Sequence, residues 1–318
     1  MTLPSTVRLT DVGPRDGFQM ETRFLPTDLK IATVEALAAA GLPEIEATSF
    51  VHPRVIPQMA DAAEVLGAVL APERAALRAG TRFIALVPNL KGAVRALDAG
   101  AEGLRQVIIV TESYNRRNVG MAVDESIAVF EQVVELAASR GVEAHAVLGA
   151  AFGCPMEGDV PIDRVVDVAR RCAELGRHGA GRFALGLGDS AGLGHPLQTR
   201  GLIGAVRDAL PDTHLWLHLH DTRGTGIANA FAALEMGIDH FDTSLGGLGG
   251  CPVVRGASGN IATEDMIYVC HEMGIDTGVD LERVRAASRR LEEFLGRPLP
   301  SRVLQAGTRE QLVALQDA

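Results

Sequence analysis

The chain lacks several features that would assign it to a specialised class of protein. It has only four cysteines in 318 residues, and they do not show zinc-finger spacing. A chain of this length does not need disulfides for stability, so we expect a reducing, cytoplasmic environment. No apolar run approaches the length of a membrane span, and the first predicted strand starts too early to leave room for a signal or transit peptide. We therefore expect no membrane insertion.

Basic residues are also scarce relative to acidic ones. The chain has 30 lysines and arginines against 40 aspartates and glutamates, a net charge of −10, without a basic stripe. This balance argues against nucleic-acid binding but allows an anionic small substrate, which needs only a few local basic groups. Hydrophobic residues make up 47% of the chain and charged ones 22%, which is typical of a globular enzyme with a large core.

Short apolar runs alternate with helical patterns along most of the chain. Continuous apolar runs are typical of parallel strands covered on both faces. Eight strand–helix units predict an α/β fold, a (β/α)₈ TIM barrel. The predicted strands are Val7–Val12, Glu44–Thr48, Arg82–Val87, Leu104–Val110, Glu143–Ala151, Phe183–Gly188, Leu215–His220 and Phe241–Leu245. The helices are Asp28–Ala40, Met59–Leu70, Leu90–Ala99, Asp124–Arg140, Ile162–Glu174, Leu197–Leu210, Gly226–Met236 and one starting at Thr263.

The domain organisation follows from the same pattern. Length alone would allow two domains, and a doubly wound sheet would need a Gly-x-Gly-x-x-Gly turn after its first strand. The first strand is instead followed by the pentapeptide Gly-Pro-Arg-Asp-Gly, and no linker or composition shift is visible. We predict a barrel over residues 1–276. Residues 277–318 form a helical extension of the same domain, with helices at Leu281–Leu295 and Arg309–Leu315.

Two histidines stand out at the end of the seventh predicted strand. His218 and His220 are two residues apart, and positions i and i+2 of a strand point to the same face. A glycine-rich loop with Cys251 and Asn260 follows the next strand and ends at a helix start. Taken alone, the pair could be two surface imidazoles and the loop an ordinary turn.

The barrel geometry places other polar residues beside this pair. Residues just past the C-terminal ends of the strands converge on one mouth. Two imidazoles, a carboxylate and an amide oxygen there suit octahedral Mg²⁺ or Mn²⁺ better than a closed structural Zn²⁺ site, and no organic-cofactor motif is present. The polar residues expected at this mouth are Arg15, Asp16, Glu46, Asp189, His218, His220, Cys251, Asn260 and Glu264.

These residue types support a defined chemistry. A metal can chelate a substrate hydroxyl and a neighbouring oxygen, and Arg15 can stabilise an oxyanion beside it. Cys251, on a glycine-rich loop, can donate a proton to a carbanion-like intermediate, or it can be a thiol without a role. Glu46 and Asp189 can act as a base or orient other groups; the alternative is an ordinary salt bridge at a strand end.

Four blocks of sequence resemble the 3-hydroxy-3-methylglutaryl-CoA lyase family of the DRE-TIM metallolyase superfamily. They read VGPRDGFQME, IEATSFVHP, LHLHDTRGTGIAN and GLGGCP followed by GASGNIATED. The resemblance spans residues 7–280, and the Gly-Gly-Cys-Pro loop favours the lyases over the related synthases. It implies a metal-dependent retro-Claisen cleavage of an acyl-CoA substrate into acetyl-CoA and acetoacetate, carried out by a homodimer.

The resemblance also assigns roles to individual residues. It implies that Arg15 stabilises the enolate of the departing acetyl-CoA and that Cys251 protonates it. Glu46, Asp189 and Glu264 match acidic residues of the family's site. The implied metal ligands are Asp16, His218, His220 and Asn260.

Some positions depart from the family pattern, and we expect them to line the substrate side of the mouth. Met20, His145 and Arg223 are the main ones, and Arg223 can either turn inward to pair a carboxylate or face solvent. These departures leave two alternatives open. One is a lyase for a related ester, such as citramalyl-CoA or a longer 3-substituted homologue. The other is a non-catalytic metal-binding barrel.

If Cys251 is the proton donor, Cys251→Ser should lower turnover while metal binding survives. The serine keeps the shape but is a much weaker acid than a thiol, which is mostly protonated at neutral pH. Steady-state kinetics and a metal titration on the same sample measure both effects. Unchanged turnover would leave this thiol without a catalytic role.

Overall fold

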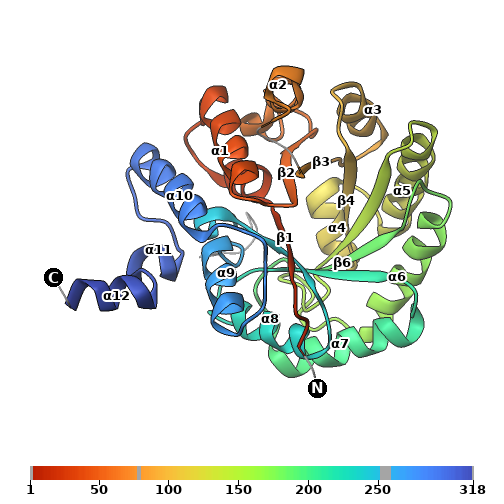
Figure 1. Cartoon of the computed structure of the whole chain (residues 1–318). Coiled ribbons are helices and arrows are strands. Elements are labelled where there is room, and N and C mark those ends of the chain that lie inside the picture. Colours follow the sequence, from red (N-terminus) through yellow and green to blue (C-terminus); the bar gives the residue numbers. More distant parts are fainter. Residues whose placement is uncertain (1–2, 77–79, 251–258, 317–318) are drawn as a thin grey trace.

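The computed structural model describes residues 3–76, 80–250 and 259–316, and its centre is a closed parallel barrel (Figure 1). Each strand pairs with the next, and β8 closes the ring on β1. The predicted TIM barrel is therefore confirmed, with strand boundaries within a few residues of those expected. The strands are β1 (Arg8–Asp11), β2 (Glu44–Ser49), β3 (Arg82–Leu86), β4 (Gly103–Ile109), β5 (Glu143–Gly149), β6 (Ala184–Asp189), β7 (His214–Leu219) and β8 (His240–Thr243).

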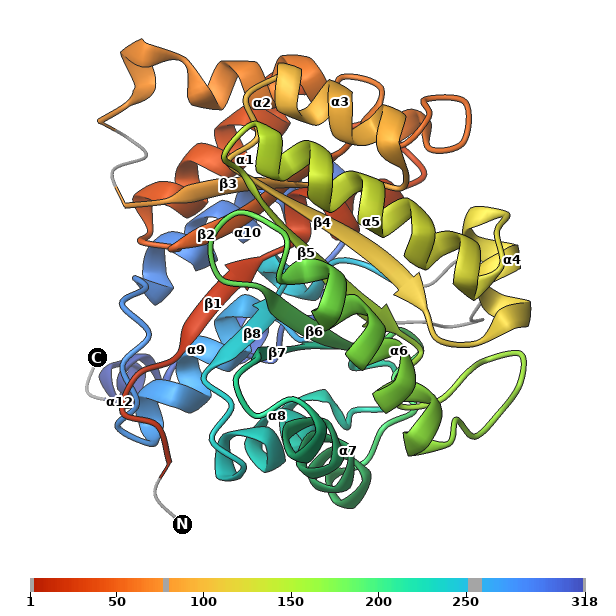
Figure 2. The same ribbon diagram turned by 90° about the vertical axis from the view of Figure 1, so that its right-hand side faces the viewer.

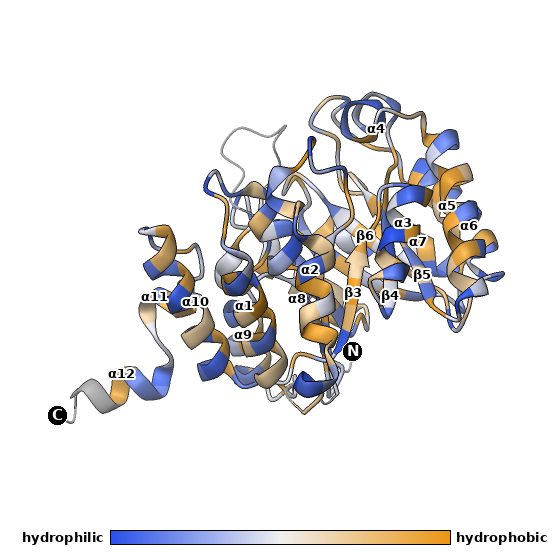
Figure 3. Ribbon diagram, turned by 90° about the horizontal axis from the view of Figure 1, so that it is seen from above, coloured by the Kyte–Doolittle hydropathy of each residue, from blue (hydrophilic) through white to orange (hydrophobic). Residues whose placement is uncertain are grey.

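One long helix follows each strand, and together these helices surround the barrel (Figures 1 and 2). They carry both hydrophobic and hydrophilic residues, as helices packed on one side do (Figure 3). No described helix is long and apolar enough to cross a membrane. The helices are α1 (Thr27–Ala39), α2 (Ala62–Leu70), α3 (Leu90–Asp98), α5 (Val123–Ser139), α6 (Ile162–Gly176), α7 (Pro196–Ala209), α8 (Gly226–Glu235) and α9 (Thr263–Glu272).

Several elements were not predicted. Helix α4 (Glu112–Val119) precedes α5 and buries only Tyr114 and Asn115, so it shows no apolar period, and Gly120 ends it in the left-handed conformation with φ 74°. Helix α11 (Arg302–Ala306) is a single short turn capped by Ser301. The remaining helical turns are η1 (Gly13–Gly17), η2 (Phe18–Met20), η3 (Pro57–Met59), η4 (Pro72–Arg74) and η5 (Leu245–Gly247).

The C-terminal extension consists of α10 (Leu281–Leu295), α11 and α12 (Arg309–Gln316). Helix α10 packs against α1 and α9, whereas α12 lies away from the barrel (Figures 1 and 3). The Asp265 carboxylate of α9 accepts hydrogen bonds from Ser301 Oγ and the Val303 backbone N–H, both at 2.8 Å. This carboxylate therefore fastens α11 to the barrel.

The interior of the barrel is charged, although TIM barrels usually fill it with branched apolar side chains. Arg105 of β4 is 2% exposed, and its guanidinium donates to Glu44 of β2 and Asp242 of β8, both at 2.8 Å. The same guanidinium lies 4.7 Å from the ring centroid of Trp216 on β7. One arginine therefore connects four strands across the interior.

Replacing this arginine should be costly. Arg105→Met keeps the length of the side chain but leaves Asp242 without its cation, and breaking a buried pair in this way costs ~3–5 kcal/mol. Urea unfolding should show that loss. Arg140→Met is the matched control, because its pair with Asp98 is about half exposed and should contribute ~1 kcal/mol or less. Equal losses in the two variants would contradict a stabilising role for Arg105.

Candidate active site

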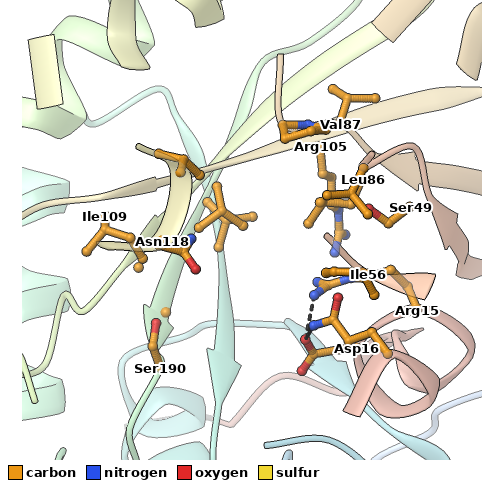
Figure 4. A pocket seen from close by; sticks show the side chains of 18 of the residues that line it. Arg15, Asp16, Ser49, Ile56, Leu86, Val87, Arg105, Ile109, Asn118 and Ser190 are labelled. Carbon is orange, nitrogen blue, oxygen red and sulfur yellow. Dashed lines mark hydrogen bonds and ion pairs between the residues drawn. The ribbon is translucent and has the colours of Figure 1, made fainter. Parts of the chain in front are cut away.

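A cavity of about 760 Å³ opens at the mouth of the barrel (Figure 4). Of the residues predicted to meet there, five line it: Arg15, Asp16, Glu46, His218 and His220. They come from the ends of β1, β2 and β7, which are far apart in sequence but close in the closed ring. The expected convergence of strand ends is therefore observed for this set.

The two histidines face each other inside the cavity. His218 belongs to β7, His220 follows it directly, and their Nε2 atoms are 3.1 Å apart. They are 9% and 3% exposed, so the interpretation as surface imidazoles is wrong. Burial, followed by the neighbouring His218, lowers the pKa of His220 to about 4. At neutral pH this imidazole is neutral and has a lone pair to offer.

Asn260 is placed by backbone pairing at the end of β7. It forms an isolated antiparallel bridge with His220, and Ile261 N–H donates to Leu219 O at 3.0 Å. Its Nδ2 donates to Asp16 Oδ2 at 2.7 Å. Gly249 passes beside this pair with φ 129°, where a Cβ would lie 2.4 Å from Asn260 Nδ2. Glycine is required there because any side chain would displace the amide.

Arg15 and Asp16 lie on the helical turn η1 directly after β1. Arg15 Nε donates to Glu46 Oε2 at 2.9 Å, and its Nη1 is hydrogen-bonded to Asp16. Burial alone would lower the pKa of Arg15, but the charges of Glu46 and Asp16 raise it overall. Burial would likewise raise the pKa of Asp16, but Arg15 and the histidines lower it overall. Both side chains are therefore charged, and Glu46 fixes the direction of the guanidinium.

These residues fit a divalent cation. Ligand atoms of Asp16, His218 and His220 all lie within 4.8 Å of one another. Neighbouring ligands of an octahedral ion at ~2.1 Å would be ~3 Å apart, close to the separation of the two Nε2 atoms. Asn260 Oδ1 is buried and lacks a hydrogen-bond partner within the described part of the chain. A cation would satisfy this orphaned oxygen.

Asp242 of β8 was missed by the sequence analysis although it contacts the site directly. Its Oδ2 accepts from Trp216 Nε1 and is hydrogen-bonded to His218 Nδ1, both at 3.2 Å. Burial would raise the pKa of Asp242, but Arg105 and His218 lower it overall. A charged carboxylate at Nδ1 keeps the proton there and leaves Nε2 free as a ligand. The available signal was an aspartate inside the buried run His-Phe-Asp-Thr.

Comparison with known proteins identifies the family. The family model described as HMGL-like matches residues 6–291. The chain belongs to the HMGL-like family. It is 39% identical over 310 residues to the cytoplasmic 3-hydroxy-3-methylglutaryl-CoA lyase of Rattus norvegicus, covering 98% of this chain and 87% of the relative. The resemblance found in the sequence is therefore confirmed.

Solved structures of HMG-CoA lyases have the same fold. The enzyme of Bacillus subtilis is 40% identical, with a TM-score of 0.89 and coverage of 96% of this chain and 99% of that chain. The enzyme of Acinetobacter baumannii, solved with coenzyme A and 3-methylmalate, is 37% identical, with a TM-score of 0.88 and coverage of 97% and 98%. The agreement extends over almost the whole length of each chain.

Two of the acidic residues matched to the family's site, Asp189 and Glu264, are not among the described residues that line the cavity. Asp189 accepts backbone N–H bonds from Leu193 and Gly194 at 2.9 and 2.8 Å. Glu264 accepts from Gly246 N–H at 2.9 Å and contacts Ser288 of α10, and burial raises its pKa to about 8. Their contacts support a role in holding the loops after β6 and β8. Cys251 lies outside the described residues.

Two of the departures from the family pattern do not line the cavity, and that expectation was wrong for them. The ring of His145 packs between Phe183 and Trp216, because its place on β5 is below the mouth. Arg223 is exposed and donates to the carbonyls of Ala191 and Gly192, so of its two alternatives the solvent-facing one holds. Met20 does line the cavity, as expected.

The contact between Asp242 and His218 should matter for metal binding. Asp242→Asn keeps the shape but removes the charge that holds the Nδ1 proton, so Mn²⁺ affinity should fall ~10–100-fold. Calorimetric titration measures the loss. Asp265→Asn, which changes a half-buried carboxylate in the C-terminal attachment, should keep wild-type affinity. A folded Asp242→Asn protein that binds Mn²⁺ normally would contradict this positioning.

Proposed function

We propose that the chain cleaves 3-hydroxy-3-methylglutaryl-CoA into acetyl-CoA and acetoacetate in a divalent-metal-dependent retro-Claisen reaction. The observation that carries this proposal is one cavity in which a buried cation site adjoins a fixed arginine. A retro-Claisen cleavage needs both, since the hydroxyl must lose its proton and the departing enolate must be stabilised. The similar proteins are 3-hydroxy-3-methylglutaryl-CoA lyases, which supports the same assignment.

Asp16, His218, His220 and Asn260 would hold the metal. Their nitrogen and oxygen atoms, without a thiolate, suit Mg²⁺ or Mn²⁺ better than zinc. When bound, the metal lowers the pKa of the substrate's 3-hydroxyl and orients it. The homodimer and the cytoplasmic location expected from the sequence remain predictions.

Arg15 performs the other half of the chemistry. The 3-hydroxyl gives its proton to a base, the C2–C3 bond breaks as C3–O becomes a carbonyl, and the electron pair of the broken bond forms the enolate of acetyl-CoA. The Arg15 guanidinium, held by Glu46 and Asp16, stabilises the negative charge on the thioester oxygen. Proton return to C2 completes acetyl-CoA, and Cys251 is our predicted donor for that step. The other fragment leaves as acetoacetate.

An acetyl-CoA release assay on the purified full-length chain tests the assignment. Activity with 3-hydroxy-3-methylglutaryl-CoA should disappear after exhaustive chelation and return with Mg²⁺ or Mn²⁺. Citramalyl-CoA serves as the competing substrate in the same assay. Full activity in the chelated protein would reject the metal dependence, and cleavage of citramalyl-CoA alone would replace the proposed substrate.

Arg15→Lys should lower kcat by ~10²-fold or more with a modest change in KM. The lysine keeps the charge but loses the planar fork that lets one side chain contact Glu46 and the oxyanion together. Arg117→Lys is the matched control, because Arg117 is exposed at the rim of the same cavity, and its kcat should stay near wild type. A variant of Arg15 that raises only KM would contradict a transition-state role.

A further inference from the structure

The mouth of the barrel is divided into a charged half and an apolar half. Strands β7, β8, β1 and β2 are neighbours in the closed ring, and their ends carry the cation site, Arg15 and Glu46. Strands β3 to β6 form the opposite half. This division places all of the proposed chemistry on one side of the cavity.

The strands of the opposite half contribute mainly hydrocarbon to the lining, and the polar residues Asn89 and Ser190 lie in the loops that follow them. Leu86 of β3, Val107 and Ile109 of β4, and Val147 of β5 face the cavity. Arg105 lies at the floor of this half, but Glu44 and Asp242 bind its guanidinium. No carboxylate or imidazole of β3 to β6 is among the described lining residues.

Helix α4 covers this half at the mouth (Figure 2) and is largely hydrophilic (Figure 3). It follows β4 and contributes Tyr114, Arg117, Asn118 and Val119 to the lining, and Met121 follows just after it. In Figure 4, Ile109, Asn118 and Ser190 lie across the cavity from Arg15 and Asp16. Ile109 and the two polar side chains therefore face the cation site across the cavity.

Gly149 at the end of β5 keeps this recess open. A Cβ there would lie 2.5 Å from Ile109 Cδ1 and 3.1 Å from Ser190 Oγ. A larger residue would push Ile109 aside. The cavity as a whole, at about 760 Å³, is within the ~300–1,000 Å³ range of pockets that hold sizeable ligands.

We propose that the apolar half receives an alkyl branch on C3 of the acyl group, and that the chain prefers 3-hydroxy-3-alkylglutaryl-CoA esters whose branch is longer than methyl. This inference rests on the proposed function. C3 carries the hydroxyl held at the cation site, the thioester arm, the carboxylate arm and the branch, so the branch starts two bonds from the bound oxygen. The hydroxyl, the thioester oxygen and the carboxylate are polar and suit the charged half, which leaves the apolar half for the branch.

Burial of the branch gives the expected size of the preference. Each buried methylene contributes ~0.8 kcal/mol, or about fourfold in kcat/KM. A butyl branch adds three methylenes to the methyl group, so the butyl ester should exceed the methyl ester in kcat/KM by ~10-fold or more. The competing occupant of this half is the pantetheine arm of the thioester, which both esters share.

The test compares kcat/KM for the methyl and butyl esters in the metal-loaded full chain and three variants. Val147→Phe fills the apolar half and should reduce the butyl-to-methyl ratio at least ~10-fold. Val147→Ala enlarges it and should raise the ratio, which keeps the test decisive if the phenylalanine variant does not fold. Val55→Phe adds the same bulk at an exposed position of the rim and should change both esters alike.

Each outcome separates this inference from the proposed function. A wild-type preference for the butyl ester that Val147→Phe abolishes supports the branch site. Equal or slower cleavage of the butyl ester overturns the inference while the proposed function stands. A Val147→Phe variant that loses activity toward both esters equally would place pantetheine in the apolar half, and this result also overturns the inference. Cleavage of neither ester by the wild type rejects the proposed function itself.

Discussion

The carboxylate of Asp242 is the contact on which the rest of the interior depends. One oxygen binds Arg105, and the other binds Trp216 and His218. Arg105 in turn needs this charge, because an arginine that is 2% exposed is tolerated only when it is paired. The ion pair that fills the barrel and the imidazole that faces the cavity therefore share one acceptor. The two carboxylate oxygens of Asp242 therefore contribute both to the stability of the fold and to the orientation of His218.

The electrostatics of the mouth explain why its groups have the protonation states that the chemistry needs. Asp16 keeps its charge because Arg15 and the two histidines outweigh its burial. His220 stays neutral because burial and His218 outweigh the attraction of Asp16. A carboxylate and a neutral imidazole are the forms that bind a cation. Burial and the neighbouring charges together maintain both forms.

The sequence predicted the barrel because each strand is a continuous apolar run, and it predicted the histidine pair because the strand period is two. It did not predict the buried ion pair of Arg105 and Asp242. A single charged residue inside an apolar run does not show which face of the strand it lies on or which residue pairs with it. Helix α4 was missed because its exposed residues have no apolar period. His145 was misplaced because its depth along β5 depends on strand register, and the choice between the two alternatives for Arg223 depends on loop partners that only the tertiary fold sets.

The four proposed metal ligands and Arg15 all come from the contiguous arc β7–β8–β1–β2, and this has an evolutionary consequence. Single substitutions in the facing arc, β3 to β6, can change which substrate fits while the residues that carry out the reaction stay unchanged. Chemistry and selectivity are then separate modules of a single ring. Paralogues that share the reaction but differ in the shape of their substrates are reachable from such a barrel by ordinary point mutation.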